Sequence, residues 1–208
     1  MKNPENTDAI KDWLGTGTIN IFGRPFAGKD TQGALLAEEF DGKLLGGGEI
    51  LRGSEMPERI KEMMKSGMLI PTDDYIDIVL PYLKQDHFGA HPLILSSVGR
   101  WHGEEDGVIE ATEQSGHPMK AVIYLDLSED LVRERWEKFS GTEGRGMRHD
   151  DTKEVLEIRL EEYREKTLPV IEFYRQDGLL IEIDGNQTPE KVHHAILSEL
   201  ANRALTSP

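Results

Sequence analysis

The chain has 208 residues and a formal net charge of -15, from 39 acidic against 24 basic side chains. This length suits one domain with a full core, and so negative a surface argues against nucleic-acid or anionic-membrane partners. The absence of cysteine excludes disulfides and thiolate-bound metals, and no apolar run suits a signal peptide or a membrane span. We therefore expect a cytoplasmic monomer in which local Arg and Lys clusters attract anionic ligands.

Residues 1–17 form an N-terminal extension, with Ile10, Trp13 and Leu14 at helical spacing. This spacing predicts a short helix packed on the domain, or alternatively an element that binds a partner.

Further along the chain, apolar runs alternate with helix-like segments. Strands are predicted at Thr18–Phe22, Lys43–Leu45, Pro92–Leu95, Met119–Leu125 and Leu179–Ile183. Helices are predicted at Lys29–Phe40, Glu49–Gly53, Pro57–Ser66, Thr72–Lys84, Glu129–Phe139, Lys153–Gln176 and Thr188–Arg203. Apolar strands that alternate with helices indicate a parallel sheet covered on both faces, with ligands at the carboxyl ends of its strands.

A candidate phosphate site lies between the first predicted strand and the first long helix, where residues 23–32 read Gly-Arg-Pro-Phe-Ala-Gly-Lys-Asp-Thr-Gln. Gly23 and Gly28 let the backbone turn so that its N–H groups point toward phosphate oxygens, and Lys29 and the helix dipole add positive charge. The competing interpretation, a glycine-rich turn with a chance lysine, is disfavoured by the strand before it and the helix after it.

Further motifs follow in a fixed order, and with them the chain resembles the adenylate kinase family of nucleoside monophosphate kinases. The loop matches the family pattern Gly-x-Pro-Gly-x-Gly-Lys-Gly-Thr-Gln at Gly23, Pro25, Gly28, Lys29, Thr31 and Gln32. The other segments similar to the family are Gly48–Arg52, Gly67–Pro71 with Asp73, Ser96–Arg100, Arg148–Asp151 with Arg159 and Tyr163, Pro169–Tyr174, and Ile183–Gln187. Their order and spacing make the resemblance very specific.

The resemblance implies an α/β fold of the P-loop NTPase type, in which a five-stranded parallel sheet lies between two layers of helices. It also implies a domain over residues 18–208 with an acceptor-binding lobe at about 46–75 and a short lid at about 139–150. The implied reaction is the reversible, Mg²⁺-dependent transfer of the ATP γ-phosphoryl group to a nucleoside monophosphate, AMP first. The glycine-rich segment Ser140–Gly146 has no cluster able to hold zinc, and His149, His193 and His194 are expected at the surface.

Transfer between two nucleotides gathers many negative charges, so catalysis depends on alignment and charge neutralisation. Arginine suits this task because its fork grips two phosphate oxygens and keeps its charge. The catalytic residues implied by the resemblance are Lys29, Arg100, Arg148 and Arg159. The expected ATP-binding residues are Gly23, Pro25, Ala27, Gly28, Lys29, Asp30, Thr31, Arg135 (stacked over the base) and Asn186. The expected acceptor-binding residues are Gly47, Glu49, Arg52, Leu69, Arg100 and Glu104.

Two departures from the family concern magnesium. The family has an Asp after the third strand that orders Mg²⁺, whereas this chain has Ser96, and Asp30 replaces a glycine that follows the loop lysine. We hypothesise that Asp30 supplies the missing carboxylate; equally, Asp30 could simply cap the start of the helix.

Two further departures concern the acceptor base. Gly47 and Glu104 stand where adenylate-specific members have Thr and Gln. A carboxylate only accepts hydrogen bonds, which would suit the donors of guanine, so GMP is an alternative acceptor. Two other interpretations remain: a different small phosphate acceptor, and a regulatory nucleotide-binding protein without turnover, which Ser96 and Phe26 suggest.

Overall fold

Five apolar segments form one fully parallel sheet in the computed structural model, which describes residues 4–85, 88–139 and 152–206. The strand order is β2-β3-β1-β4-β5. The strands are β1 (Thr18–Gly23), β2 (Lys43–Gly46), β3 (Leu93–Ser96), β4 (Met119–Asp126) and β5 (Leu180–Asp184). The predicted five-stranded parallel sheet is therefore confirmed, with each strand within a residue or two of its expected position.

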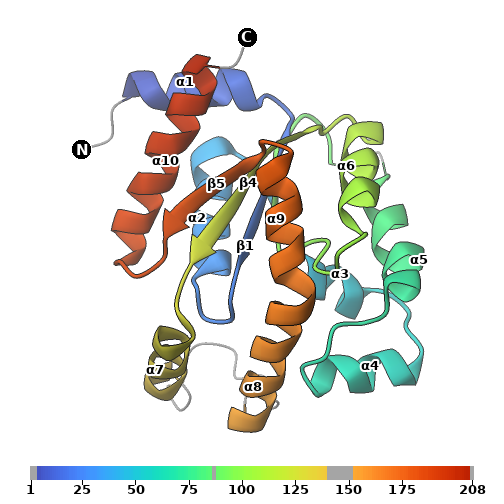
Figure 1. Ribbon diagram of the computed structural model, residues 1–208. Coiled ribbons are helices and arrows are strands. Elements are labelled where there is room, and N and C mark those ends of the chain that lie inside the picture. Colours follow the sequence, from blue (N-terminus) through green and yellow to red (C-terminus); the bar gives the residue numbers. More distant parts are fainter. Residues whose placement is uncertain (1–3, 86–87, 140–151, 207–208) are drawn as a thin grey trace.

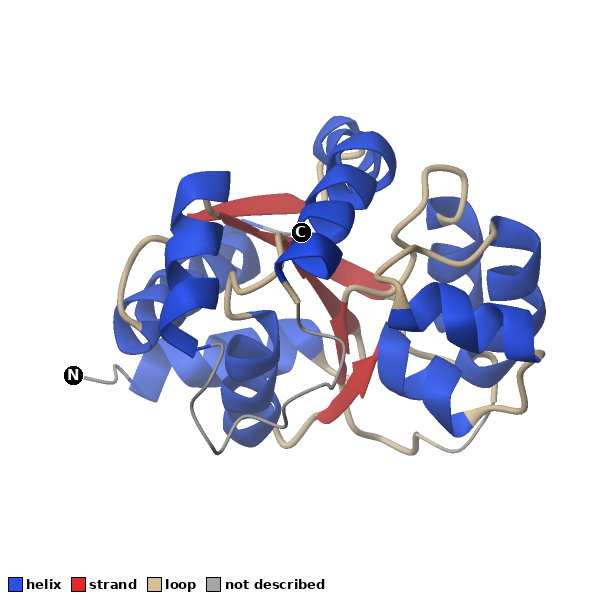
Figure 2. Ribbon diagram, turned by 90° about the horizontal axis from the view of Figure 1, so that it is seen from below, coloured by secondary structure: helices blue, strands red, loops and turns tan. Residues whose placement is uncertain are grey.

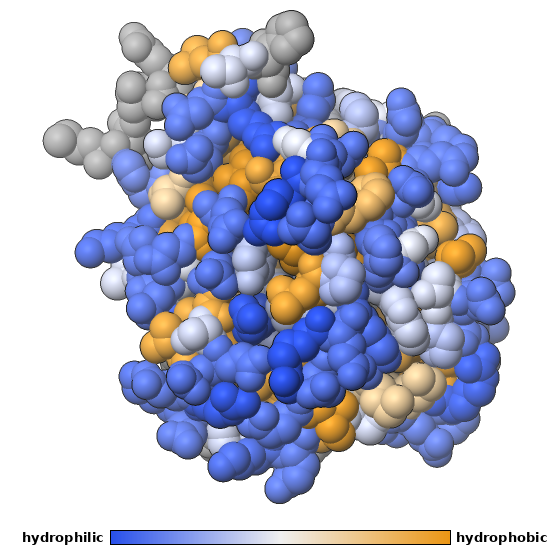
Figure 3. Space-filling model, in the orientation of Figure 1, coloured by the Kyte–Doolittle hydropathy of each residue, from blue (hydrophilic) through white to orange (hydrophobic). Residues whose placement is uncertain are grey.

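Helices cover both faces of this sheet (Figures 1 and 2). Their bounds are α1 (Pro4–Leu14), α2 (Lys29–Phe40), α3 (Gly47–Gly53), α4 (Glu58–Lys65), α5 (Thr72–Leu83), α6 (Glu105–Gln114), α7 (Glu129–Phe139), α8 (Lys153–Glu162), α9 (Leu168–Gln176) and α10 (Pro189–Thr206). Within the described ranges, none of them is long and apolar enough to cross a bilayer. Most of the face seen in Figure 3 is hydrophilic, with scattered apolar patches.

Side chains of the strands alternate between two apolar layers. Ile19 and Ile21 of β1 pack in a cluster with residues of α1, α2 and α10, whereas Phe22 packs with residues of β4 and α9. This alternation follows from the pleat of a strand, in which successive side chains point to opposite faces. Thr18 and Asn20 are the polar side chains of β1, and both are fully buried.

The N-terminal helix α1 belongs to this core. It lies against α10 (Figure 1), and Ile10 and Leu14 are each only 1% exposed. The helical spacing of apolar residues in the extension therefore reflects packing on the domain.

One helix is missing from the sequence expectations. No element was expected between Leu95 and Met119, yet α6 occupies Glu105–Gln114. Gly107 and a high share of acidic residues weaken the helical signal. The glycine lets α6 pack closely on α5, since a Cβ there would lie 2.9 Å from Cδ1 of Leu80, whose side chain would have to shift.

The long helix expected at Lys153–Gln176 is continuous but contains a π-helical turn, η1 (Tyr163–Thr167), between α8 and α9. At this turn the backbone N–H of Leu168 donates to the carbonyl of Tyr163, five residues earlier. Pro169 follows directly and has no N–H to continue the regular pattern. The turn therefore has a local cause in the sequence.

If α1 is part of the core, Leu14→Ala should lower the free energy of unfolding by about 2–4 kcal/mol, the usual cost of truncating a buried leucine. Urea unfolding would measure this, with the exposed Asp12→Ala on the same helix as the control. A loss below about 0.5 kcal/mol, typical of surface substitutions, would show that α1 is dispensable.

Candidate active site

The phosphate loop has the tight backbone that its glycines predict. A Cβ on Gly23 would lie 2.9 Å from the carbonyl oxygen of Leu125, and Gly28 has a left-handed φ of 95°. Phe26 also adopts a left-handed φ, 61°, which is unusual for a bulky residue. Lys29 Nζ donates to the carbonyls of Gly23 and Arg24, at 2.8 Å each. The expected cation thus lies within the turn of the loop.

Arg24, which the sequence analysis did not single out, joins this loop to the end of β4. Its Nη1 donates to the carbonyl of Leu127 at 2.9 Å and to the hydroxyl of Tyr124 at 3.2 Å. The guanidinium also lies over the Tyr163 ring, 5.3 Å from its centre. Its position inside the loop motif was the one sequence signal that could have drawn attention to it.

A second loop, which we call the β3–α6 loop (residues 97–103), begins beside the phosphate loop because β1 and β3 are neighbours. Its backbone is held from several elements. Asn20 Nδ2 donates to the carbonyl of Val98 at 2.7 Å, and the N–H of Gly99 donates to the Tyr75 hydroxyl at 2.6 Å. The polar Asn20 within an apolar run was a visible but unused sign of this role.

The β3–α6 loop brings Arg100 close to Arg159 of α8, and the catalytic roles of both arginines stay predictions. Burial lowers the pKa of Arg100, and the nearby Arg159 cation lowers it further, while Tyr163 and the carboxylates of Glu162 and Glu104 oppose this shift. Anionic ligands would therefore meet two cations held close together in a poorly solvated place.

The segment Gly67–Pro71, part of the expected acceptor lobe, packs directly on α8. A Cβ on Gly67 would lie 3.0 Å from Cγ1 of Val155 and 3.1 Å from Cγ of Arg159. The N–H of Leu69 donates to Oε2 of Glu162 at 2.8 Å. This segment is therefore fixed beside the two arginines.

The same Glu162 extends the contact toward Trp101. Its carboxylate pairs with Lys166 Nζ at 2.6 Å. That ammonium lies 4.1 Å from the centre of the Trp101 ring, a cation–π contact. The end of α8 therefore reaches the segment Gly67–Pro71, and the π-helical turn reaches the β3–α6 loop.

The start of the acceptor lobe is closely packed. Gly47 is buried, and a Cβ there would lie 2.8 Å from the carbonyl oxygen of Ser97. This backbone has no room for the threonine of adenylate-specific relatives. Arg52, an expected acceptor ligand, folds its guanidinium back so that Nη1 would be 3.1 Å from a Cβ on Gly48, and Glu49 lies exposed.

The two residues that depart from the family near the magnesium position are in contact. Ser96 Oγ donates to Oδ1 of Asp30 at 2.8 Å, which joins the end of β3 to the first turn of α2. Asp30 itself is exposed. One oxygen of the Asp30 carboxylate therefore lies where the end of β3 meets the phosphate loop. The side chain is also open to solvent.

Glu104, which was expected to read the acceptor base, is a buried residue, and its role stays a prediction. It is only 3% exposed, and its Oε2 accepts a hydrogen bond from the N–H of Trp101 at 3.1 Å. Burial raises the pKa of Glu104 to about 7, although hydrogen bonds from the backbone of Trp101 and Arg100 and from Thr72 act in the opposite direction. The carboxylate thus faces the loop backbone.

On the donor side, Arg135 of α7 links two loops. Its Nη1 donates to the carbonyl of Phe26 at 3.0 Å and its Nη2 to that of Gly185 at 2.7 Å. The adjacent Asn186 donates its N–H to Asp184 at 2.8 Å. Arg135 and Asn186 are thus near the phosphate loop, and their roles toward ATP stay predictions, as do those of Pro25, Ala27 and Thr31.

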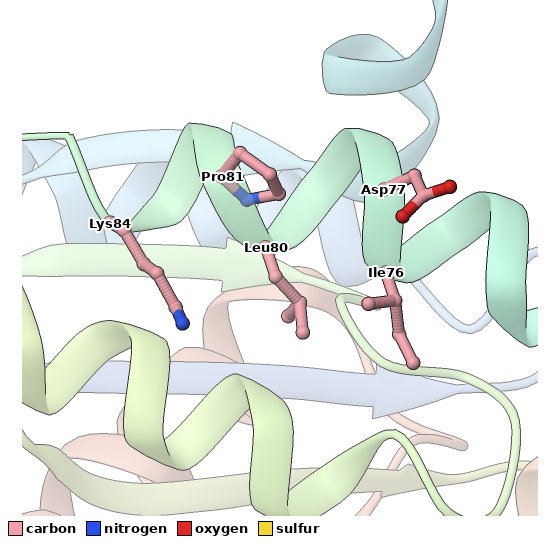
Figure 4. Close-up of a pocket in the computed structure, with 5 residues that line it drawn as sticks. All are labelled: Ile76, Asp77, Leu80, Pro81 and Lys84. Atoms are coloured by element: carbon pink, nitrogen blue, oxygen red, sulfur yellow. The ribbon is translucent and has the colours of Figure 1, made fainter.

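Three expectations fall outside the described residues: Arg148, His149, and the lid apart from Phe139. A separate shallow hollow of about 260 Å³ lies on α5, lined by Ile76, Asp77, Leu80, Pro81 and Lys84 (Figure 4). None of these residues belongs to the loops at the carboxyl ends of the strands, so the hollow is not the site.

A parallel sheet with a phosphate loop after β1 and clustered arginines beside it defines a P-loop phosphotransferase. Comparison with known proteins agrees: residues 21–179 match the family described as adenylate kinase. The chain is 31% identical over 193 residues to an adenylate kinase of Thermus thermophilus, covering 90% of this chain and 99% of that protein. An adenylate kinase of Deinococcus radiodurans is 31% identical over 188 residues, covering 86% and 94%.

Among solved structures, a gluconokinase from Sinorhizobium meliloti 1021 has a TM-score of 0.62 at 20% identity, covering 91% of this chain and 94% of that one. That likeness supports the fold alone. The chain belongs to the adenylate kinase family. It is a nucleoside monophosphate kinase, which transfers phosphoryl groups between ATP and a nucleoside monophosphate.

The raised pKa of Glu104 predicts a pH-dependent loss of stability. The folded protein holds this proton more tightly than the unfolded chain, so ionisation costs stability increasingly from the ordinary value of 4.5 up to about 7, and by a constant amount above it. Glu104→Gln cannot ionise and should therefore exceed the wild type in free energy of unfolding by up to about 3 kcal/mol above pH 7. Urea unfolding at acidic and alkaline pH would measure the difference. Equal stabilities at alkaline pH would contradict it; Glu110→Gln, exposed on α6, is the control.

Proposed function

We propose that the acceptor is AMP, so that the chain converts ATP and AMP reversibly into two ADP, with Mg²⁺ bound to the donor nucleotide. The observation that carries the transfer step of the proposal is the contact between Asp30 and Ser96, at 2.8 Å. It joins the loop suited to donor phosphates to the strand that leads into Arg100. Two phosphate groups held there would meet at neighbouring strands, as in-line transfer requires.

The residues of the chain act mainly by position and charge. Lys29 would hold the donor β- and γ-phosphates, Arg52 and Arg100 the acceptor phosphate, and Arg159 with Arg148 the group in transfer. An acceptor phosphate oxygen attacks the γ-phosphorus while the bond to the β–γ bridging oxygen breaks, which releases ADP. Cations fixed around the moving group stabilise its charge without reorganisation. Closure of the acceptor lobe and the lid would exclude water and hence hydrolysis.

AMP is named first because the curated relatives are adenylate kinases. The reason for expecting guanine was a Glu104 carboxylate free to accept from the base. That carboxylate is buried and accepts from Trp101 instead. GMP therefore remains an outcome of the test.

The test is a panel of AMP, GMP, CMP, UMP and dTMP with ATP and Mg²⁺, with ADP formation as the readout. AMP should be the fastest acceptor, and Arg100→Ala should lower kcat/KM by about a hundred- to a thousandfold, as for other groups that stabilise transition-state charge. Arg175→Ala, which removes an exposed arginine paired with Glu172 and Glu182, is the matched control and should have no effect. Tight ATP binding without turnover of any monophosphate would instead support the regulatory alternative.

The magnesium proposal concerns the donor set at Asp30. Among the described residues, no three His, Asp or Glu side chains converge on one point. A single carboxylate with a hydroxyl beside it nevertheless fits Mg²⁺, which usually keeps several waters and binds through one or two carboxylates plus substrate phosphates. We propose that Asp30, oriented by Ser96, would hold this ion, which when bound neutralises phosphate charge.

Asp30→Asn keeps the shape and an acceptor for Ser96 but removes the charge. We expect about a tenfold weaker affinity of the ATP complex for Mg²⁺ or Mn²⁺, measured by calorimetry and by Mn²⁺ electron paramagnetic resonance. Adding Ser96→Asp to this variant should restore the affinity by returning a carboxylate to the strand end. Asp41→Asn, which removes an exposed charge at the other end of α2, is the control. Unchanged metal affinity in Asp30→Asn would leave only the helix-capping role.

A further inference from the structure

The peptide group that joins Arg100 to Trp101 is held at both of its polar atoms. The hydroxyl of Thr167 on η1 donates to the Arg100 carbonyl at 3.0 Å. The N–H of the same peptide, on Trp101, donates to Oε2 of Glu104 at 3.1 Å. Because an immobile peptide fixes the Cα atom beside it, these two contacts determine where the Arg100 side chain begins.

We propose that Glu104 is a positioning residue for Arg100, which it holds through the backbone of the β3–α6 loop, and that it does not read the acceptor base. The proposal rests on the proposed function in one respect, that Arg100 binds the acceptor phosphate. A carboxylate that is 3% exposed and bonded to a backbone N–H has little surface to offer a base. Glu104 would therefore affect the binding of the acceptor phosphate by Arg100.

The contacts of the next residue, Glu105, show that Glu104 does not support the whole loop. Glu105, 2% exposed, accepts from the N–H of Gly103 at 2.6 Å and contacts His102 Nδ1 at 2.8 Å. The far end of the loop therefore has its own carboxylate. Glu104 is left with the backbone N–H groups of Arg100 and Trp101, together with the Thr72 hydroxyl.

The strength of the hydrogen bond from the Trp101 N–H to Glu104 depends on whether the carboxyl group is ionised. The groups that face it are Arg100 in the loop, Tyr75 of α5, Tyr174 of α9 and its neighbour Glu105, with the Thr72 hydroxyl nearby. A hydrogen bond to an ionised acceptor is roughly twice as strong as one to a neutral acceptor. Because burial raises the pKa of Glu104 to about 7, the loop should be held more firmly as the pH rises through neutrality.

The decisive experiment is calorimetric titration of wild type, Glu104→Gln and the exposed control Glu110→Gln with AMP and with GMP, at about pH 5.5 and about pH 8.5. Gln keeps the shape and an acceptor oxygen, so it imitates the protonated acid. We expect the ratio of Kd for Glu104→Gln to Kd for wild type to be near one at acidic pH. At alkaline pH it should rise to about five- to tenfold, and equally for AMP and GMP. The ionisation of the ligand phosphate changes both Kd values equally, so it does not affect this ratio.

Each other result overturns the proposal in a recognisable way. A factor that differs between AMP and GMP would make Glu104 a base reader. A factor that is the same at both pH values, with a lower melting temperature, would make its role purely structural. A ratio near one at both pH values would mean that the contact does not reach Arg100.

A second measurement needs no nucleotide. Hydrogen exchange of the Trp101 amide should accelerate about five- to tenfold in Glu104→Gln above pH 7, relative to the Gly99 amide that Tyr75 holds in the same loop. If wild type binds no monophosphate, the proposed function fails. The exchange ratio still decides whether Glu104 holds this peptide, and an unchanged ratio would refute it.

Discussion

The guanidinium of the half-buried residue Arg100 is the group on which the rest of the site depends. A partly desolvated cation with a second cation, Arg159, nearby is stable only where its surroundings are fixed and its charge is partly balanced. Contacts on its loop come from β1, α5, the residue that precedes α6, and η1, through Asn20, Tyr75, Glu104 and Thr167. Elements far apart in the chain therefore determine the position of one side chain.

The departures from the family are paired with changes in their surroundings. Ser96 and Asp30 differ together and touch each other. Gly47 differs where the Ser97 carbonyl leaves no room for a side chain. A relative's residue placed singly into this chain would therefore meet a neighbour that has also changed. Family patterns identify the site here, but roles have to be assigned from the contacts of this chain.

The sheet and the phosphate loop could be predicted because their signals are local: apolar runs, and glycines at fixed spacing around Lys29. The meeting of Asp30 with Ser96 could be hypothesised because both depart from one pattern. The orientation of Glu104 could not, since it depends on Trp101 and Thr72, which no periodicity connects to it. Similarly, α6 was missed because Gly107 weakens its helical signal, whereas the close packing of Gly107 on Leu80 is visible only in the fold. Local signals predicted the elements, and distant contacts decided the side chains.

The π-helical turn sets the rotational phase between the two halves of the long C-terminal helix. With its extra residue, Glu162 and Lys166 reach the acceptor lobe and Trp101, while Thr167 reaches Arg100. Each residue of a regular helix advances about 100° around its axis. Deleting one residue here would rotate Arg159 by about that angle relative to Thr167. In evolution, this stretch should therefore accept substitutions more readily than changes in length.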